Sequence, residues 1–151
     1  MKIIALTGII GSGKSTAAAI LKDLGAEVIE SDKLGHEVLE PEQPGWQKVV
    51  EAFGKKILTE ENKINRKKLA GIVFNDPEAL KKLEQLLHPI IDDMTLELIE
   101  QHRRSGTGVL VIELAPITKP DWIPLIDQIW IIKADKEITI ERLKQKGMDE
   151  N

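Results

Sequence analysis

A glycine-rich stretch near the N-terminus constrains the fold of this 151-residue chain more than any other feature. Residues 7–16 read TGIIGSGKST and directly follow the apolar run IIAL. Glycine in ordered structure costs about 0.5–1 kcal/mol relative to alanine, so folds keep it where the backbone bends sharply or where another group approaches closely. The stretch therefore predicts a tight turn between a buried strand and a helix.

This stretch fits the pattern G-x-x-x-x-G-K-[ST] of a phosphate-binding loop, or P-loop. In such a loop the backbone N–H groups form a nest for an anion, and the helix that follows adds its positive end. The lysine reaches the β- and γ-phosphates, and the serine hydroxyl binds Mg²⁺. A strand–helix turn that binds nothing is the alternative. We predict that ATP is bound by Gly8, Gly11, Ser12, Gly13, Lys14, Ser15 and Thr16. Lys14 is also predicted to be catalytic, and Ser15 to be a magnesium ligand.

The composition indicates an ordinary soluble domain, with 42% hydrophobic and 30% charged residues. A net charge of −4 gives no basic field for nucleic acid. The absence of cysteine excludes disulfides and thiolate metal sites. No apolar stretch is long enough to span a membrane or to form a signal peptide. We therefore expect a cytoplasmic protein with neither a nucleic-acid nor a membrane partner.

Apolar runs that do not alternate with polar residues predict strands covered on both faces, as in a parallel sheet. The runs are 2–7, 26–30, 108–114 and 128–134. Helical spacing with a stop at Gly25 predicts a helix between the first two. Residues from about 33 to 105 read as helices. We predict an α/β fold of the three-layer P-loop NTPase type, nucleoside-kinase-like, with a parallel sheet and a helical substrate-domain insertion. Its parts are a core of 1–32 and 106–141, an insertion of about 33–105, and a last segment of 142–151.

Within the insertion, Asp76 and Pro77 form a good helix start, with the aspartate as cap and the proline at the first helical position. His88 and Pro89 predict a kink or a restart, because the residue before a proline is disfavoured in a helix. A last helix is expected from about Pro89 to Arg104.

Several motifs follow the P-loop in a fixed order: LGAEVIESDKLGHEVLEP, FGKKIL, INRKKLAGIVF and LEQLLHPII. Together they resemble the dephospho-coenzyme A (dephospho-CoA) kinase family over nearly the whole chain. The resemblance implies a P-loop kinase that transfers the γ-phosphoryl group of ATP to the 3′-hydroxyl of dephospho-CoA. Two alternatives stay open: a nucleotide-binding module with weakened or absent catalysis, and another small-molecule P-loop kinase.

The resemblance also implies roles for four residues outside the P-loop. Asp32 is the candidate general base, and a helix cap is its alternative role. His36 and Arg66 are candidate substrate-binding residues, although each could simply lie on the surface. Glu113 ends the third strand and is a candidate magnesium ligand, or else a solvated residue at a strand end.

The resemblance also implies that residues 142–151 are the start of a lid. Arg142 and Lys146 stand where the family has two lid arginines that cover the phosphates. A solvated helix face is the alternative, and lysine does not replace the planar fork of arginine. Ile9 replaces a usual glycine, and Lys119 stands where an acid is usual. Because the chain ends at Asn151, we expect an incomplete lid with reduced or absent activity, and a free sheet edge that permits self-association.

Overall fold

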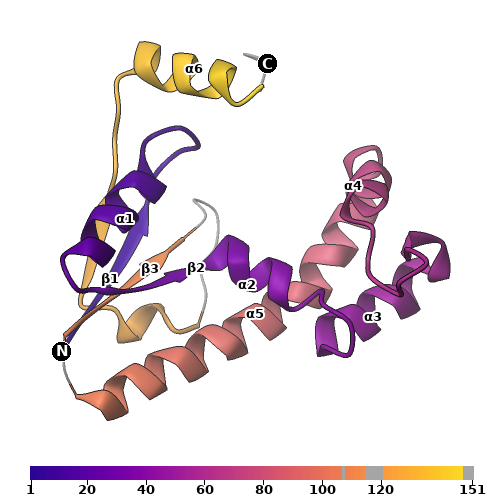
Figure 1. Ribbon diagram of the computed structural model, residues 1–151, viewed down its shortest axis with the longest axis horizontal. Helices are drawn as coiled ribbons and strands as arrows, with labels where there is room; N and C mark the ends of the chain where they lie inside the picture. The colour runs from indigo at the N-terminus through magenta and orange to yellow at the C-terminus, as the bar shows by residue number, and fades with distance from the viewer. Residues whose placement is uncertain (107, 115–120, 148–151) are drawn as a thin grey trace. The chain divides into compact units, whose positions relative to one another are not determined.

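A computed structural model describes residues 1–106, 108–114 and 121–147 of the chain (Figure 1). Its elements are β1 (Lys2–Thr7), α1 (Lys14–Asp23), β2 (Glu27–Glu30), α2 (Ser31–Glu37), α3 (Pro44–Phe53), η1 (Lys55–Ile57), α4 (Arg66–Phe74), α5 (Pro77–Ser105), β3 (Val109–Glu113), η2 (Ile123–Leu125), β4 (Gln128–Ile131) and α6 (Lys136–Gln145). Contacts divide the chain into two units. The core unit comprises Met1–Ser31 and Leu98–Asn151, and the helical unit comprises Asp32–Glu97.

The core unit contains one four-stranded sheet with the order β2-β3-β1-β4. All three strand pairs are parallel. In this register Glu113 of β3 lies opposite Leu6 of β1 on one side and Glu30 of β2 on the other. Residues of β1 and β3 on both faces are buried, which explains why their sequences are continuous in apolar residues. This arrangement confirms the predicted α/β fold with a parallel sheet.

Helix α1 packs on the sheet through its small residues. Ala18 is buried against Leu6 and Val111. The helix ends where the sequence predicts, because Gly25 follows the last turn with a φ of 97° and donates its N–H to the carbonyl of Lys22 at 2.9 Å.

Strand β4 differs from its prediction. It is shorter than expected, although the N–H of Ile132 still donates to the carbonyl of Thr7 at 2.7 Å. Ile129 and Ile131 are 56% and 62% exposed, so the expectation of a strand covered on both faces is wrong here. β4 ends the strand order, and within the described residues it has a neighbouring strand, β1, on one side only.

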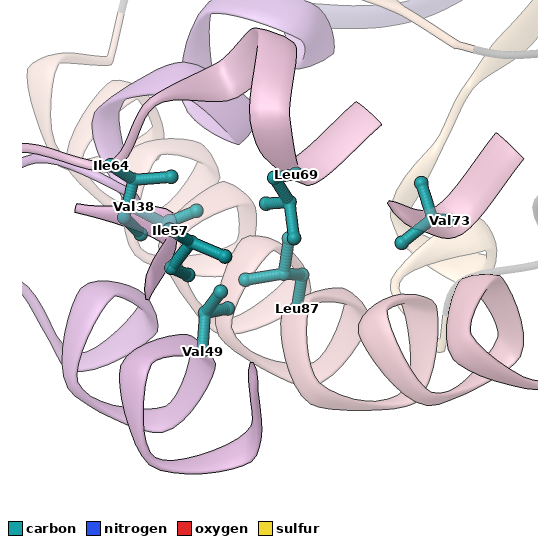
Figure 2. Packing of buried hydrophobic residues seen from close by; sticks show 7 residues of the cluster. All are labelled: Val38, Val49, Ile57, Ile64, Leu69, Val73 and Leu87. Carbon is teal, nitrogen blue, oxygen red and sulfur yellow. The ribbon is translucent and has the colours of Figure 1, made fainter. Parts of the chain in front are cut away.

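The helical unit has a hydrophobic core of its own (Figure 2). Its buried residues are Val38, Val49, Ile57, Ile64, Leu69, Val73 and Leu87. They come from α3, η1, α4 and α5 and from the segments between the helices. The ends of two of these helices follow from local sequence signals. Gly54 ends α3 with a φ of 82°, and the side chain of Asn65 caps α4 by accepting from the N–H of Lys68 at 3.0 Å.

Helix α5 runs without a break over 29 residues, so the predicted restart at Pro89 is wrong. Proline withholds one N–H, but the residues around it pack their apolar side chains: Leu87 is buried in the core of the helical unit, and Ile90 packs against it. The predicted cap is confirmed, since Asp76 accepts from two backbone N–H groups at 3.0 and 3.1 Å. Despite its length, α5 is not apolar enough to cross a membrane, nor is any other helix of the described residues.

Candidate active site

Polar residues gather at the carboxyl ends of the core strands. Glu113 ends β3 and is in register with Leu6 of β1 on one side and Glu30 of β2 on the other. The glycine-rich loop begins directly after β1. In open parallel sheets ligands bind at this edge, where neighbouring strands lead to opposite sides.

The glycine-rich loop turns through three glycines with positive φ: 155° at Gly8, 80° at Gly11 and 99° at Gly13. Gly8 also lacks room for a side chain, because a Cβ there would overlap the carbonyl oxygen of Ile132 and lie 2.7 Å from the hydroxyl of Ser12. Both reasons that justify glycine in ordered structure therefore hold at Gly8.

Lys14 and Ser15 open α1 and point to groups at the end of β3. The Ser15 hydroxyl donates to Glu113 Oε1 at 3.2 Å, and Lys14 Nζ donates to the carbonyl of Leu114 at 3.5 Å. The two predicted magnesium ligands thus lie together. A hydroxyl and a carboxylate suit Mg²⁺, which prefers oxygen ligands and completes its shell with phosphates and water. The described residues hold no group of three or more His, Cys, Asp or Glu that could bind a metal ion.

Two other loop residues differ in exposure. Thr16 is exposed, whereas Ser12 is 3% exposed and its hydroxyl has no hydrogen-bond partner among the described residues. The N–H of Ser12 donates to the carbonyl of Ile9 at 3.1 Å. Their contacts with ATP stay predictions.

Helix α6 packs against the loop. Arg142 Nη1 donates to the carbonyl of Gly11 at 3.3 Å. A Cβ on Gly11 would lie 3.2 Å from the methyl group of Thr139 and 3.3 Å from Leu143 Cγ. The sequence analysis missed Thr139 and Leu143, whose spacing of four residues puts them on one face of α6. Lys146 follows α6 and is exposed.

The remaining predicted residues lie in the helical unit. Asp32 and His36 are exposed on α2, and their spacing of four residues puts them on one face of that helix. Asp32 lies in the first turn of α2 and makes no hydrogen bond or ion pair with the described residues. Arg66 pairs with Glu40 at 3.4 Å on the surface. Lys119 lies outside the described residues.

Ser31 is a residue that sequence reasoning missed. Its hydroxyl donates to the carbonyl of Glu113 at 2.6 Å, so it joins the end of β2 to the end of β3. Asp32 is the next residue of the chain. The only available signal was a serine directly after a strand.

Comparisons with known proteins show the family to which the chain belongs. A family model described as "Dephospho-CoA kinase" matches residues 2–151. The chain is 36% identical to a dephospho-CoA kinase of Dehalococcoides mccartyi, covering 97% of this chain and 73% of the relative. It is 39% identical to one of Corynebacterium jeikeium, covering 100% and 78%.

Solved structures give the same result. The structure is similar to a dephospho-CoA kinase from Campylobacter jejuni, with a TM-score of 0.72 and 33% identity over 97% of this chain and 74% of that chain. It is also similar to TT1252 from Thermus thermophilus, with a TM-score of 0.75 and 29% identity over 98% and 74%. The chain therefore belongs to the dephospho-CoA kinase family.

Proposed function

We propose that this protein transfers the γ-phosphoryl group of ATP to the 3′-hydroxyl of dephospho-CoA, in the cytoplasm. One observation carries the proposal: Lys14 and Ser15, at the start of α1, lie beside Glu113 at the point where β1 and β3 end. A lysine, a hydroxyl and a carboxylate at this edge are what phosphoryl transfer from a nucleotide requires. The identity of the acceptor is inferred from the relatives, which are dephospho-CoA kinases.

The loop holds the triphosphate of ATP in this proposal. Its positive-φ glycines turn backbone N–H groups toward one anion, and α1 adds its positive end. Lys14 reaches the β- and γ-phosphates. Its present bond to the Leu114 carbonyl is 3.5 Å long, so it exchanges a weak contact for a charged one.

Ser15 and Glu113 would hold Mg²⁺. When bound, the ion neutralises charge on the β- and γ-phosphates. The hydroxyl and the carboxylate lie 3.2 Å apart, so both are available to one ion without a rearrangement of the backbone. Ser31 supports the pair, because its bond to the Glu113 carbonyl holds the end of β3 in place.

Asp32 acts as general base on the acceptor. Its carboxylate is exposed and free of partners among the described residues, so it can accept the proton of the 3′-hydroxyl. The hydroxyl oxygen then bonds to the γ-phosphorus, the bond from that phosphorus to the bridging oxygen breaks, and ADP leaves. His36, on the same face of α2, and Arg66, on α4, contact the acceptor in this proposal.

The test is a phosphoryl-transfer assay with ATP, Mg²⁺ and dephospho-CoA, in which mass spectrometry detects the 3′-phosphorylated product. D32N should lower kcat by about 10²–10⁴, the usual contribution of a general base. Its dissociation constant for ATP should not change.

E37Q is the matched control, because it neutralises another exposed carboxylate of the same helix. Equal turnover of D32N and E37Q would exclude Asp32 as the base. If the unaltered chain binds ATP in calorimetry but forms no product, it is a nucleotide-binding module and not a working kinase.

A further inference from the structure

Strand β2 passes directly into helix α2, with no residue between Glu30 and Ser31. Glu30 is the last residue of β2 in register with β3, where it lies opposite Glu113. Beyond this pair the backbone turns into the helix and leaves the parallel ladder. The Ser31 hydroxyl donates to the Glu113 carbonyl at 2.6 Å, which is shorter than most bonds from a hydroxyl to an oxygen. A side chain therefore extends the link between β2 and β3 by one residue.

The same junction is a point where the chain passes from one unit to the other. Ser31 ends the first segment of the core unit, and Asp32 begins the helical unit. The two residues are neighbours in the first turn of α2. The hydrogen bond of Ser31 therefore holds the turn that carries the Asp32 carboxylate.

This bond matters more for α2 than for β3. Strand β3 lies between β2 and β1, and Leu114, which follows it, donates its N–H to the carbonyl of Leu6 at 2.8 Å. Helix α2 is only seven residues long, and its buried residue is Leu34. An isolated helix of that length is unstable in water, so its position depends on contacts with the rest of the chain. Loss of the Ser31 hydroxyl should therefore loosen the first turn of α2 while β3 stays in the sheet.

We propose that Ser31 is a positioning residue, whose hydroxyl holds the Asp32 carboxylate in place for the reaction. This inference rests on the proposed function, in which Asp32 removes the proton of the acceptor hydroxyl. Ser31 itself touches neither substrate nor metal. A general base works only within hydrogen-bond reach of the proton that it removes, and a displacement of about 1 Å can lower the rate by about 10²-fold. Asp32 makes no hydrogen bond or ion pair with the described residues, so its own side chain does not supply this order.

The alternative is a serine that only stabilises the fold. Ser105 provides the comparison, because its hydroxyl donates to the carbonyl of His102, also at 2.6 Å. That bond lies within the end of α5 and involves neither α2 nor β3. S105A thus removes a bond of the same kind and length without altering the first turn of α2.

The test is a double-mutant cycle on kcat, measured at saturating ATP, Mg²⁺ and dephospho-CoA so that binding of metal and substrates does not limit the rate. S31A should lower kcat about ten-fold, less than D32N does, because the carboxylate is still present. In the D32N background S31A should have no further effect, because no base is left to position. S31T keeps the hydroxyl and should retain the kcat of the unaltered chain. S105A should be destabilised in a urea titration, as S31A is, but should keep its kcat.

Equal losses of kcat on S31A in both backgrounds would overturn the proposal, because a purely structural role does not depend on Asp32. It would also be overturned if S31A kept its kcat, or if S31T or S105A lost as much as S31A. Failure of the proposed function gives a different result, in which the unaltered chain forms no product or D32N turns over as fast as E37Q. Either result would remove this inference as well, whereas a large loss in D32N with none in S31A refutes this inference alone.

Discussion

Replacing Gly8 by alanine tests how closely the end of β4 approaches the P-loop. An added Cβ would overlap the carbonyl oxygen of Ile132 and lie 2.7 Å from the hydroxyl of Ser12. This carbonyl belongs to the backbone, and the N–H of Ile132 donates a hydrogen bond to the carbonyl of Thr7 at 2.7 Å. Neither strand can therefore move aside cheaply.

Two costs add in this variant. The φ of 155° at Gly8 is one that residues with a side chain rarely adopt, at about 1–3 kcal/mol. The overlap with Ile132 adds about 1–3 kcal/mol of overpacking. The G25A variant carries only the first cost, because Gly25 also has a positive φ, 97°, but its added Cβ would meet no atom within 4 Å. The difference in stability between G8A and G25A therefore measures the cost of the overlap. We expect G8A to be less stable than G25A by about 2 kcal/mol.

Thermal unfolding followed by circular dichroism measures this difference. In a chain of this size 1 kcal/mol shifts Tm by about 2–4 °C, so the Tm of G8A should lie about 4–8 °C below that of G25A. Binding of ATP should weaken as well, because the backbone of the loop is displaced. If the two variants unfold at the same temperature, the close approach of Ile132 does not explain the glycine, and the reasoning fails.

Three further predictions address other contacts. I57A should lose about 2–5 kcal/mol of unfolding free energy in a urea titration, since Ile57 is fully buried, whereas exposed I138A should lose little. S31A should lose about 1 kcal/mol in the same titration, because the Glu113 carbonyl loses its 2.6 Å donor, and an unchanged midpoint would contradict this. E113Q should raise by about ten-fold the Mg²⁺ concentration needed for ATP binding, because an amide binds the cation less strongly than a carboxylate does. An unchanged Mg²⁺ requirement would remove Glu113 from the metal site.

The fold was predictable from local patterns. Each described strand lies within a predicted apolar run, and Gly25, Gly54 and Asp76 mark helix ends where their chemistry requires. The continuity of α5 through Pro89 was not predictable, because it depends on apolar residues around the proline that pack against elements distant in the chain. A local rule about proline contains no information on that packing.

The site was predictable in part. The pairing of Ser15 with Glu113 follows from a parallel sheet, which brings the ends of β1 and β3 to one edge. The packing of Thr139 on Gly11 was not predictable, because it joins residues 128 positions apart with no charge or motif to link them. The roles of all the predicted site residues in binding and catalysis remain predictions, those of Lys14, Ser15 and Glu113 included.

The bond between Arg142 and Gly11 has a consequence for the order of binding events. The guanidinium uses a carbonyl oxygen of the loop, which is an acceptor. An incoming triphosphate uses the N–H groups, which are donors. In the proposed function, cation and anion would therefore use different atoms of the same short peptide, and this hydrogen bond of Arg142 would not have to break before the nucleotide binds. The guanidinium of Arg142 would then add positive charge beside the loop before any phosphate binds there.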